Sequence, residues 1–217
     1  AFTSGFFNLA QAHHVELIGG DTTSGSLSIC IQILGEIEHG KALRRSNARV
    51  GDDIWVSGHL GDAALALANE QKRIVLKSEE VQSCLPALNR PQARVKLGQR
   101  LINAAHSAID VSDGLMADLG HILKQSNVAA CINIDMVPCS NTLRTHLPQP
   151  LAQNCLLAGG DDYELCFTAP KARRTYLEQL SKELVIPLTI IGNISAGKGL
   201  RVKNTHGHDI MLESKGY

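Results

Sequence analysis

The sequence has 217 residues, of which 44% are hydrophobic and 19% charged, and its 21 basic side chains balance its 21 acidic ones. This length supports one large globular domain, or one domain with part of another, and the balanced charge argues against nucleic acid and anionic membranes as partners. The sequence contains no signal peptide and no apolar run of membrane-spanning length, and its 6 cysteines form no CxxC pair, so we expect reduced thiols in the cytoplasm.

The first forty residues are predicted to form a helix and a β-hairpin. Apolar residues recur at helical spacing over residues 2–12, and two strands are predicted at 15–18 and 27–33. Gly19, Gly20 and Asp21 lie between these strands, where backbone N–H groups could approach a phosphate and the carboxylate could hold a metal ion. Glycine and aspartate are also the commonest turn residues, so an ordinary turn is the alternative.

From residue 51 onward, strands and helices are predicted to alternate. A turn at 51–53 leads into a strand at 54–57 and, after a loop from Gly58 to Gly61, into an alanine-rich helix at 63–69. A loop before a helix N-terminus can bind an anion, but this one lacks the lysine of a P-loop and the spacing of a dinucleotide fingerprint. We therefore expect a turn with left-handed glycines, followed by a connection with some helix in it and a helix at 92–105.

The central stretch, residues 107–115, predicts a strand, an acidic turn and a helix that continues to about residue 126. Ser112 or Asp113 could cap this helix, which requires only one of them. Asp110 then remains at the end of an apolar strand, where a dehydrated carboxylate without a partner costs several kcal/mol. With no Lys or Arg nearby, these oxygen ligands suit a hard divalent cation, and we favour a metal or phosphate site over plain caps and turns.

A second glycine pair followed by acidic residues occurs at 159–162, before a predicted core strand at 163–168. Further strands are predicted at 130–136, 188–194, 200–202 and 210–212, and a helix at 176–184. This alternation predicts an α/β fold, with helices packed against one sheet as a sandwich. The cysteines lack the spacing of a zinc site, and the sequence lacks the G-x-S-x-G elbow of a serine hydrolase.

Five short motifs, in this order, resemble the thiamine-monophosphate kinase family; they are Leu17-Ile-Gly-Gly-Asp-Thr-Thr23, Ala42-Leu-Arg-Arg-Ser46, Ile109-Asp-Val-Ser-Asp-Gly-Leu115, Gly159-Gly-Asp-Asp-Tyr-Glu-Leu165 and Lys215-Gly-Tyr217. The family belongs to the superfamily of aminoimidazole-ribonucleotide (AIR) synthetase, in which an N-terminal ATP-binding domain pairs with its copy in a dimer. The resemblance implies that residues 1–48 are the end of that N-terminal domain and that residues 49–217 are an AIR-synthetase-like C-terminal α/β domain.

The resemblance also implies roles for single residues. The implied ATP contacts are Gly20, Asp21, Arg45 and Ser112. The implied magnesium ligands are Asp21, Asp110 and Asp113. The implied contacts to thiamine monophosphate are Asp161, which stands where the family usually has glutamate, and Tyr217.

The activity implied by the resemblance is transfer of the γ-phosphoryl group of ATP to thiamine monophosphate, assisted by several Mg²⁺ ions, in a cytoplasmic homodimer. This reaction is the last step of thiamine diphosphate biosynthesis. Family members carry further acidic motifs ahead of the part that this chain matches, so we expect the chain to be a fragment that is inactive alone. Two alternatives stay open: a sister ATP-using enzyme, similar to selenophosphate or AIR synthetase, and a non-catalytic module that binds nucleotide or thiamine phosphate.

Overall fold

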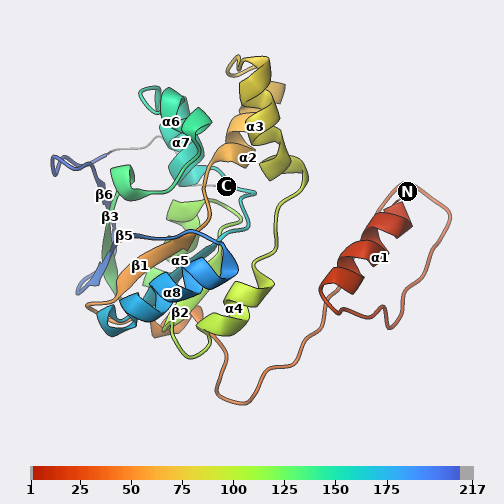
Figure 1. Ribbon diagram of the computed structural model, residues 1–217, viewed down its shortest axis with the longest axis horizontal. Coiled ribbons are helices and arrows are strands. Elements are labelled where there is room, and N and C mark those ends of the chain that lie inside the picture. The colour runs from red at the N-terminus through yellow and green to blue at the C-terminus, as the bar shows by residue number, and fades with distance from the viewer. Residues whose placement is uncertain (1, 211–217) are drawn as a thin grey trace. The chain divides into compact units, whose positions relative to one another are not determined.

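The computed structural model describes residues 2–210, and residues 1 and 211–217 lie outside the described part. The chain divides into two units, Ala1–His39 and Gly40–Tyr217. Each unit is described by itself below (Figure 1). No helix in the described part is both long enough and apolar enough to span a membrane.

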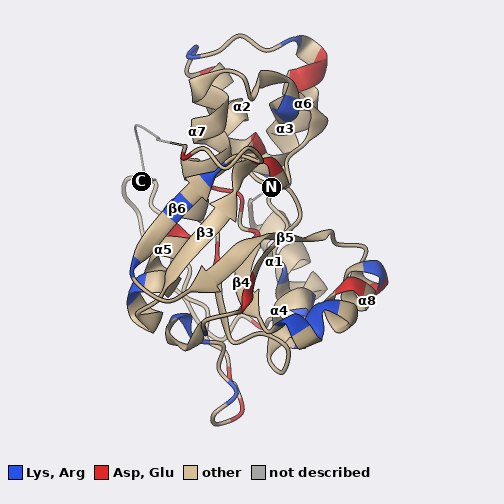
Figure 2. Ribbon diagram, turned by 90° about the vertical axis from the view of Figure 1, so that its left-hand side faces the viewer, with Lys and Arg blue, Asp and Glu red and all other residues tan. Residues whose placement is uncertain are grey.

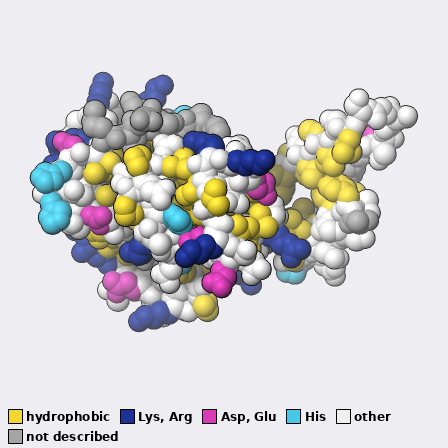
Figure 3. All heavy atoms as spheres, turned by 90° about the horizontal axis from the view of Figure 1, so that it is seen from above, with side chains coloured by type: hydrophobic (Ala, Val, Ile, Leu, Met, Phe, Trp, Pro, Cys, Tyr) yellow, Lys and Arg dark blue, Asp and Glu magenta, His cyan; other side chains and the backbone are white. Residues whose placement is uncertain are grey.

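The first unit contains the predicted helix but not the predicted hairpin. Helix α1 covers Phe2–Ala12, whereas residues 15–39 form no strand. The apolar side chains of the two predicted strands are exposed, with Ile18 at 84% and Leu27 at 92%. Figure 3 shows apolar side chains on the surface of this unit. An isolated two-stranded hairpin is at best marginally stable in water, and nothing in this unit covers its apolar face. The hairpin prediction was therefore wrong.

The second unit is built on one six-stranded sheet. Its strands follow the order β2-β4-β1-β5-β3-β6, and all neighbouring pairs are antiparallel except the parallel pair β3 and β6. The strands are β1 (Asp53–Ser57), β2 (Ser107–Asp110), β3 (Ala129–Asn133), β4 (Leu165–Ala169), β5 (Leu188–Ser195) and β6 (Gly199–Lys203).

Helices cover both faces of this sheet (Figure 1). They are α2 (Asp62–Glu70), α3 (Ser78–Asn89), α4 (Val95–Leu101), α5 (Leu115–Ser126), α6 (Asn141–His146), α7 (Pro150–Ala158) and α8 (Arg174–Leu184). Short 3₁₀ turns occur at Arg45–Asn47, Ile134–Met136 and Lys171–Arg173. This arrangement confirms the predicted α/β sandwich.

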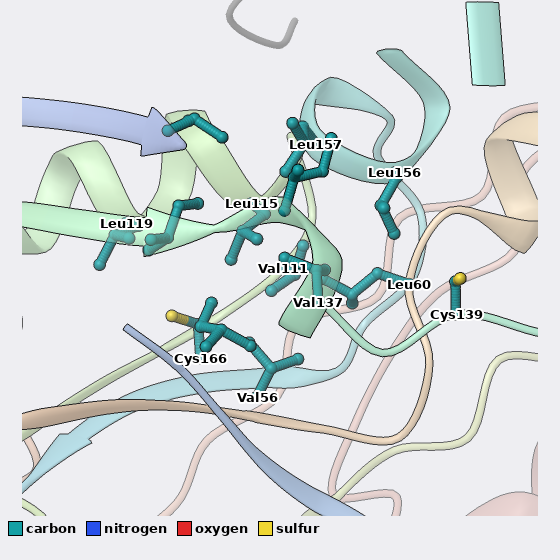
Figure 4. Close-up of a cluster of buried hydrophobic side chains, with 14 of the residues drawn as sticks. Val56, Leu60, Val111, Leu115, Leu119, Val137, Cys139, Leu156, Leu157 and Cys166 are labelled. Carbon is teal, nitrogen blue, oxygen red and sulfur yellow. The ribbon is translucent and has the colours of Figure 1, made fainter. Parts of the chain in front are cut away.

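Alternation along β1 produces the two cores. Ile54 and Val56 point into a large cluster beneath α2, α5 and α7, part of which Figure 4 shows. Trp55 points the other way, stacks on Phe167 of β4 and packs beneath α4 and α8. Helix α8 buries its leucines on this face and exposes charges of both signs (Figure 2). A strand buried on both faces is rigid, so β1 is a firm support for the loops that follow it.

Several element boundaries differ from the predicted ones. Helix α4 ends at Leu101, well before residue 105. Strand β3 ends at Asn133, because the Asn133 side chain accepts a hydrogen bond from Asp135 N and opens a 3₁₀ turn. Of the strand predicted at 210–212, residues 211 and 212 lie outside the described residues. An isolated bridge joins Lys203 to Asp209, just before that range.

Candidate functional site

The first acidic turn joins β2 to α5 and is anchored in the core on both sides. Val111 before it and Leu115 after it are fully buried (Figure 4). Gly114 has a φ of +113°, and a Cβ there would lie 2.7 Å from the backbone of Ala158 in α7. The turn therefore lies directly against the end of α7, where the second acidic turn begins.

Neither Ser112 nor Asp113 caps helix α5, so the alternative in which one of them serves as a plain cap does not hold. The N-cap residue is Gly114, and Asp118 in the first turn of the helix reaches back instead. Its Oδ2 atom accepts hydrogen bonds from the backbone N–H groups of Ser112 (2.9 Å) and Asp113 (3.0 Å). Burial raises the pKa of Asp118, the two N–H groups oppose this, and the nearby carboxylates of Asp113 and Asp110 add to the rise. The side chains of Ser112 and Asp113 remain available to a ligand.

The second acidic turn, residues 159–164, lies alongside the first. Asp161 N donates to Ser112 O (3.0 Å), and Tyr163 N donates to Val111 O (2.9 Å). Tyr163 Oη donates to Asp161 Oδ1 (3.1 Å). This hydrogen bond, followed by burial and by the charges of Asp161, Asp110 and Asp113, raises the pKa of Tyr163. The fold thus brings Asp110, Ser112, Asp113 and Asp161 together, although Ser107–Leu115 and Gly159–Leu165 are well separated in sequence.

Two residues of this second turn have left-handed backbone conformations. The φ angle is +68° at Asp161 and +50° at Tyr163. Residues other than glycine rarely adopt this backbone conformation. Each such residue costs about 1 kcal/mol or more, persists only where its surroundings enforce it, and is found preferentially at functional sites. The left-handed pair also explains why β4 begins at Leu165 and not at residue 163 as predicted.

The loop from Gly58 to Gly61 supports the second turn from behind. Both glycines have positive φ angles, +59° and +88°, as the predicted turn requires. Gly61 N donates to both carboxylate oxygens of Asp162, at 3.0 and 2.9 Å. Burial raises the pKa of Asp162 well above its ordinary value. The Gly61 N–H is therefore engaged by the protein itself.

The chemistry of the first turn fits part of a magnesium site. Asp110 and Asp113 are exposed, and within residues 2–210 neither forms an ion pair with a basic side chain. Exposed carboxylate oxygens are the ligands that Mg²⁺ prefers. However, the described residues contain no group of three or more His, Cys, Asp or Glu side chains placed to hold a metal ion. These two carboxylates therefore fit as a partial ligand set.

Of the remaining predicted site residues, Arg45 is the one that belongs to the described part of the second unit, and it does not lie at these turns. Arg45 O accepts a hydrogen bond from Ser126 Oγ (2.8 Å) at the end of α5. The acidic turn precedes the start of α5, and 12 helical residues span about 18 Å. Gly20 and the exposed Asp21, whose Oδ1 accepts from Thr22 N (2.7 Å), belong to the first unit. Tyr217 lies outside the described residues.

The two aspartates at 52 and 53 have structural partners within the protein. Both residues are 2% exposed. Asp52 Oδ2 lies 2.9 Å from His106 Nδ1, and Arg174 donates to both oxygens of Asp53, at 2.7 and 2.8 Å. The turn predicted at 51–53 is confirmed by Gly51, which has a φ of +93°.

Comparison with known proteins identifies the family of the chain. Residues 49–204 match the family described as AIR synthase related protein, C-terminal domain. Over its whole length the chain is 41% identical to thiamine-monophosphate kinase of Salmonella typhimurium and covers 67% of that protein. A solved thiamine-monophosphate kinase from Stenotrophomonas maltophilia K279a is 48% identical, with a TM-score of 0.83 over 93% of this chain and 65% of that one. AaThiL complexed with AMPPCP and TMP is 30% identical, with a TM-score of 0.66 over 81% of this chain and 53% of that one. The chain therefore spans about two thirds or less of the length of these relatives.

Proposed function

Because the chain belongs to the thiamine-monophosphate kinase family, we propose that the protein transfers the γ-phosphoryl group of ATP to the phosphate of thiamine monophosphate. The observation that carries this proposal is the juxtaposition of two acidic turns, one with Asp110, Ser112 and Asp113 and the other with Asp161. A relative that binds both AMPPCP and TMP supports it. We further propose, from the family resemblance, that the protein acts as a homodimer in the cytoplasm.

The chemistry requires positioning more than proton transfer. The attacking phosphate oxygen is already anionic, so no strong general base is needed. Two unit charges about 4 Å apart repel by about 4 kcal/mol at an effective dielectric constant near 20, and this repulsion is the main obstacle. Bound Mg²⁺ would neutralise the phosphates and hold them in line.

Each candidate site residue has a distinct part in the proposed reaction. Asp21, Asp110 and Asp113 hold Mg²⁺. Ser112 donates a hydrogen bond from its hydroxyl group to a phosphate oxygen of ATP. The family resemblance also assigns ATP contacts to Gly20 and to Arg45, which lies at the other end of α5 from Ser112. Asp161 places its carboxylate opposite the cationic thiazolium ring of the acceptor, and Tyr217 packs on the acceptor ring.

Isothermal titration calorimetry on the whole protein tests this proposal. We expect thiamine monophosphate to bind in the presence of Mg²⁺ and AMPPCP, and D113N to weaken that binding about tenfold or more through loss of one charged metal ligand. D135N is the matched control, because Asp135 is also exposed but lies beside Thr205, whose backbone N–H it accepts. Absence of Mg²⁺-dependent binding in the unaltered protein would contradict the proposal, and binding of a different acceptor would favour a sister enzyme.

A further inference from the structure

Glu164, the residue after Tyr163, is an acidic side chain enclosed by the protein. It is 5% exposed, and its backbone oxygen accepts from Val111 N (2.8 Å), which closes the second acidic turn. Both carboxylate oxygens are engaged by Arg94: Nε donates to Oε2 at 2.7 Å, and Nη2 donates to Oε1. Such a two-pronged pair fixes direction as well as distance.

The rest of the enclosure is built around the same carboxylate. Ser57 Oγ donates to Oε2 of Glu164 (2.5 Å) and accepts from Leu165 N (2.9 Å), so the hydroxyl links β1 to the start of β4. Gly58, the next residue after Ser57, lies against the same carboxylate, because a Cβ at Gly58 would lie 1.9 Å from Oε1 of Glu164. The Glu164 side chain is therefore held by Arg94 and Ser57 and lies close against Gly58.

This enclosure bears directly on the left-handed residues Asp161 and Tyr163. Their conformations are unfavourable and require external support. Their N–H groups bond to the first acidic turn, and Glu164 holds the chain immediately after them. Arg94 precedes α4, 70 residues away in sequence, yet it is the only basic partner of Glu164 among the described residues.

We propose that Arg94 is a positioning residue, which acts through Glu164 to hold Asp161 and Tyr163 against the first acidic turn and so sets the affinity for the phosphate acceptor. The first half of this proposal, that Arg94 holds the second acidic turn in place through Glu164, concerns the fold of the turn alone. The second half rests on the proposed function, because it assigns the acceptor to that turn.

Amide hydrogen exchange tests the first half without any ligand. In the whole protein, we expect R94Q to speed exchange at the N–H groups of Asp161 and Tyr163 about tenfold, because their hydrogen bonds to the first turn open more often. R174Q is the matched control: Arg174 makes a similar two-pronged pair with buried Asp53, but between α8 and β1. Equal exchange at these two amides in R94Q and the unaltered protein, or an equal increase in R174Q, would overturn the inference.

Steady-state kinetics test the second half. A displacement of about 1 Å in a positioning group can reduce efficiency about a hundredfold, so we expect R94Q to raise KM for thiamine monophosphate at least fivefold while KM for ATP stays within twofold. E164Q, which keeps the side-chain shape, is expected to do the same, and the double variant to add little to either. Additive effects, or equal changes in both KM values, would overturn the inference. An unaltered protein without thiamine monophosphate activity would instead refute the proposed function, and the exchange experiment would still decide the role of Arg94.

Discussion

At the scale of single residues, the acidic turns are supported by carboxylates that face inward. The carboxyl group of Asp162 lies behind Asp161 and accepts from Gly61 N with both oxygens. Burial raises its pKa, the Gly61 hydrogen bonds oppose this, and the charges of Asp62, Glu164 and Asp161 add to the rise. The folded protein therefore binds a proton at Asp162 more tightly than the unfolded chain does.

This tighter binding fixes the sign of a pH effect. The stabilisation is complete below the unfolded pKa of about 3.9 and is lost as pH rises through the higher folded pKa. We expect the free energy of unfolding, compared with that of D162N, to fall as pH rises above the unfolded pKa of about 3.9. D162N keeps an oxygen that can accept from Gly61 N but has no charge to bury.

The measurement is urea denaturation followed by the fluorescence of Trp55, which is the single tryptophan of the sequence. E178Q, on the exposed side of α8, is the control and should retain the pH dependence of the unaltered protein. If the difference between D162N and the unaltered protein did not change with pH, the raised pKa would be wrong.

At the scale of elements, helix α5 organises the first acidic turn. Its buried residues Leu115 and Leu119 fix the helix on the sheet, and Asp118 then ties the preceding turn to the helix through two backbone N–H groups. One side chain therefore ties the backbone at Ser112 and Asp113 to the first turn of α5.

Removing that side chain should loosen the turn. D118A leaves two N–H groups without their partner and is expected to lower the free energy of unfolding by about 1 to 3 kcal/mol, while D118N, which keeps an acceptor oxygen, should lose less. Urea denaturation followed by Trp55 fluorescence measures both. D135A removes a carboxylate that accepts one exposed N–H, from Thr205, and should change stability by about 0.5 kcal/mol or less. Equal stability of D118A and D135A would contradict this role for Asp118.

At the scale of the whole molecule, the two units differ in what they bury. The described residues of the first unit include no buried side chain, and the buried residues begin at Ala48. Both core clusters lie within the second unit and flank one continuous sheet. The cooperative stability of the chain should therefore reside in the second unit.

A chain that begins at Gly40 tests this expectation. We expect it to unfold in a single transition when followed by Trp55 fluorescence, with a free energy of unfolding within about 1 kcal/mol of the 217-residue chain, because no buried contact is removed. Loss of the transition would show that residues 1–39 contribute to folding, and would also count against the predicted domain boundary near residue 48.

Local pattern alone determined much of this protein. The strand at 54–57, the helix at 115–126 and both acidic turns were predicted correctly, because hydrophobic periodicity and turn residues act over a few neighbours. The hairpin at 15–33 was predicted wrongly, because alternation shows that a strand could form but not that another element will cover it. The local pattern also marked Asp110 and Asp113 as candidate ligands, and the family resemblance added Asp161.

Only the tertiary structure decided how those candidates are held. Glu164 stands in one of the recognised motifs, but the local pattern did not show what Arg94, Glu164 and Asp118 contact, because each depends on a partner whose position the fold sets. Arg94 and Glu164 meet across 70 residues, and the left-handed backbone of Asp161 and Tyr163 is enforced by hydrogen bonds to another turn. Residue type and spacing determine which chemistry is available, whereas long-range packing determines its geometry.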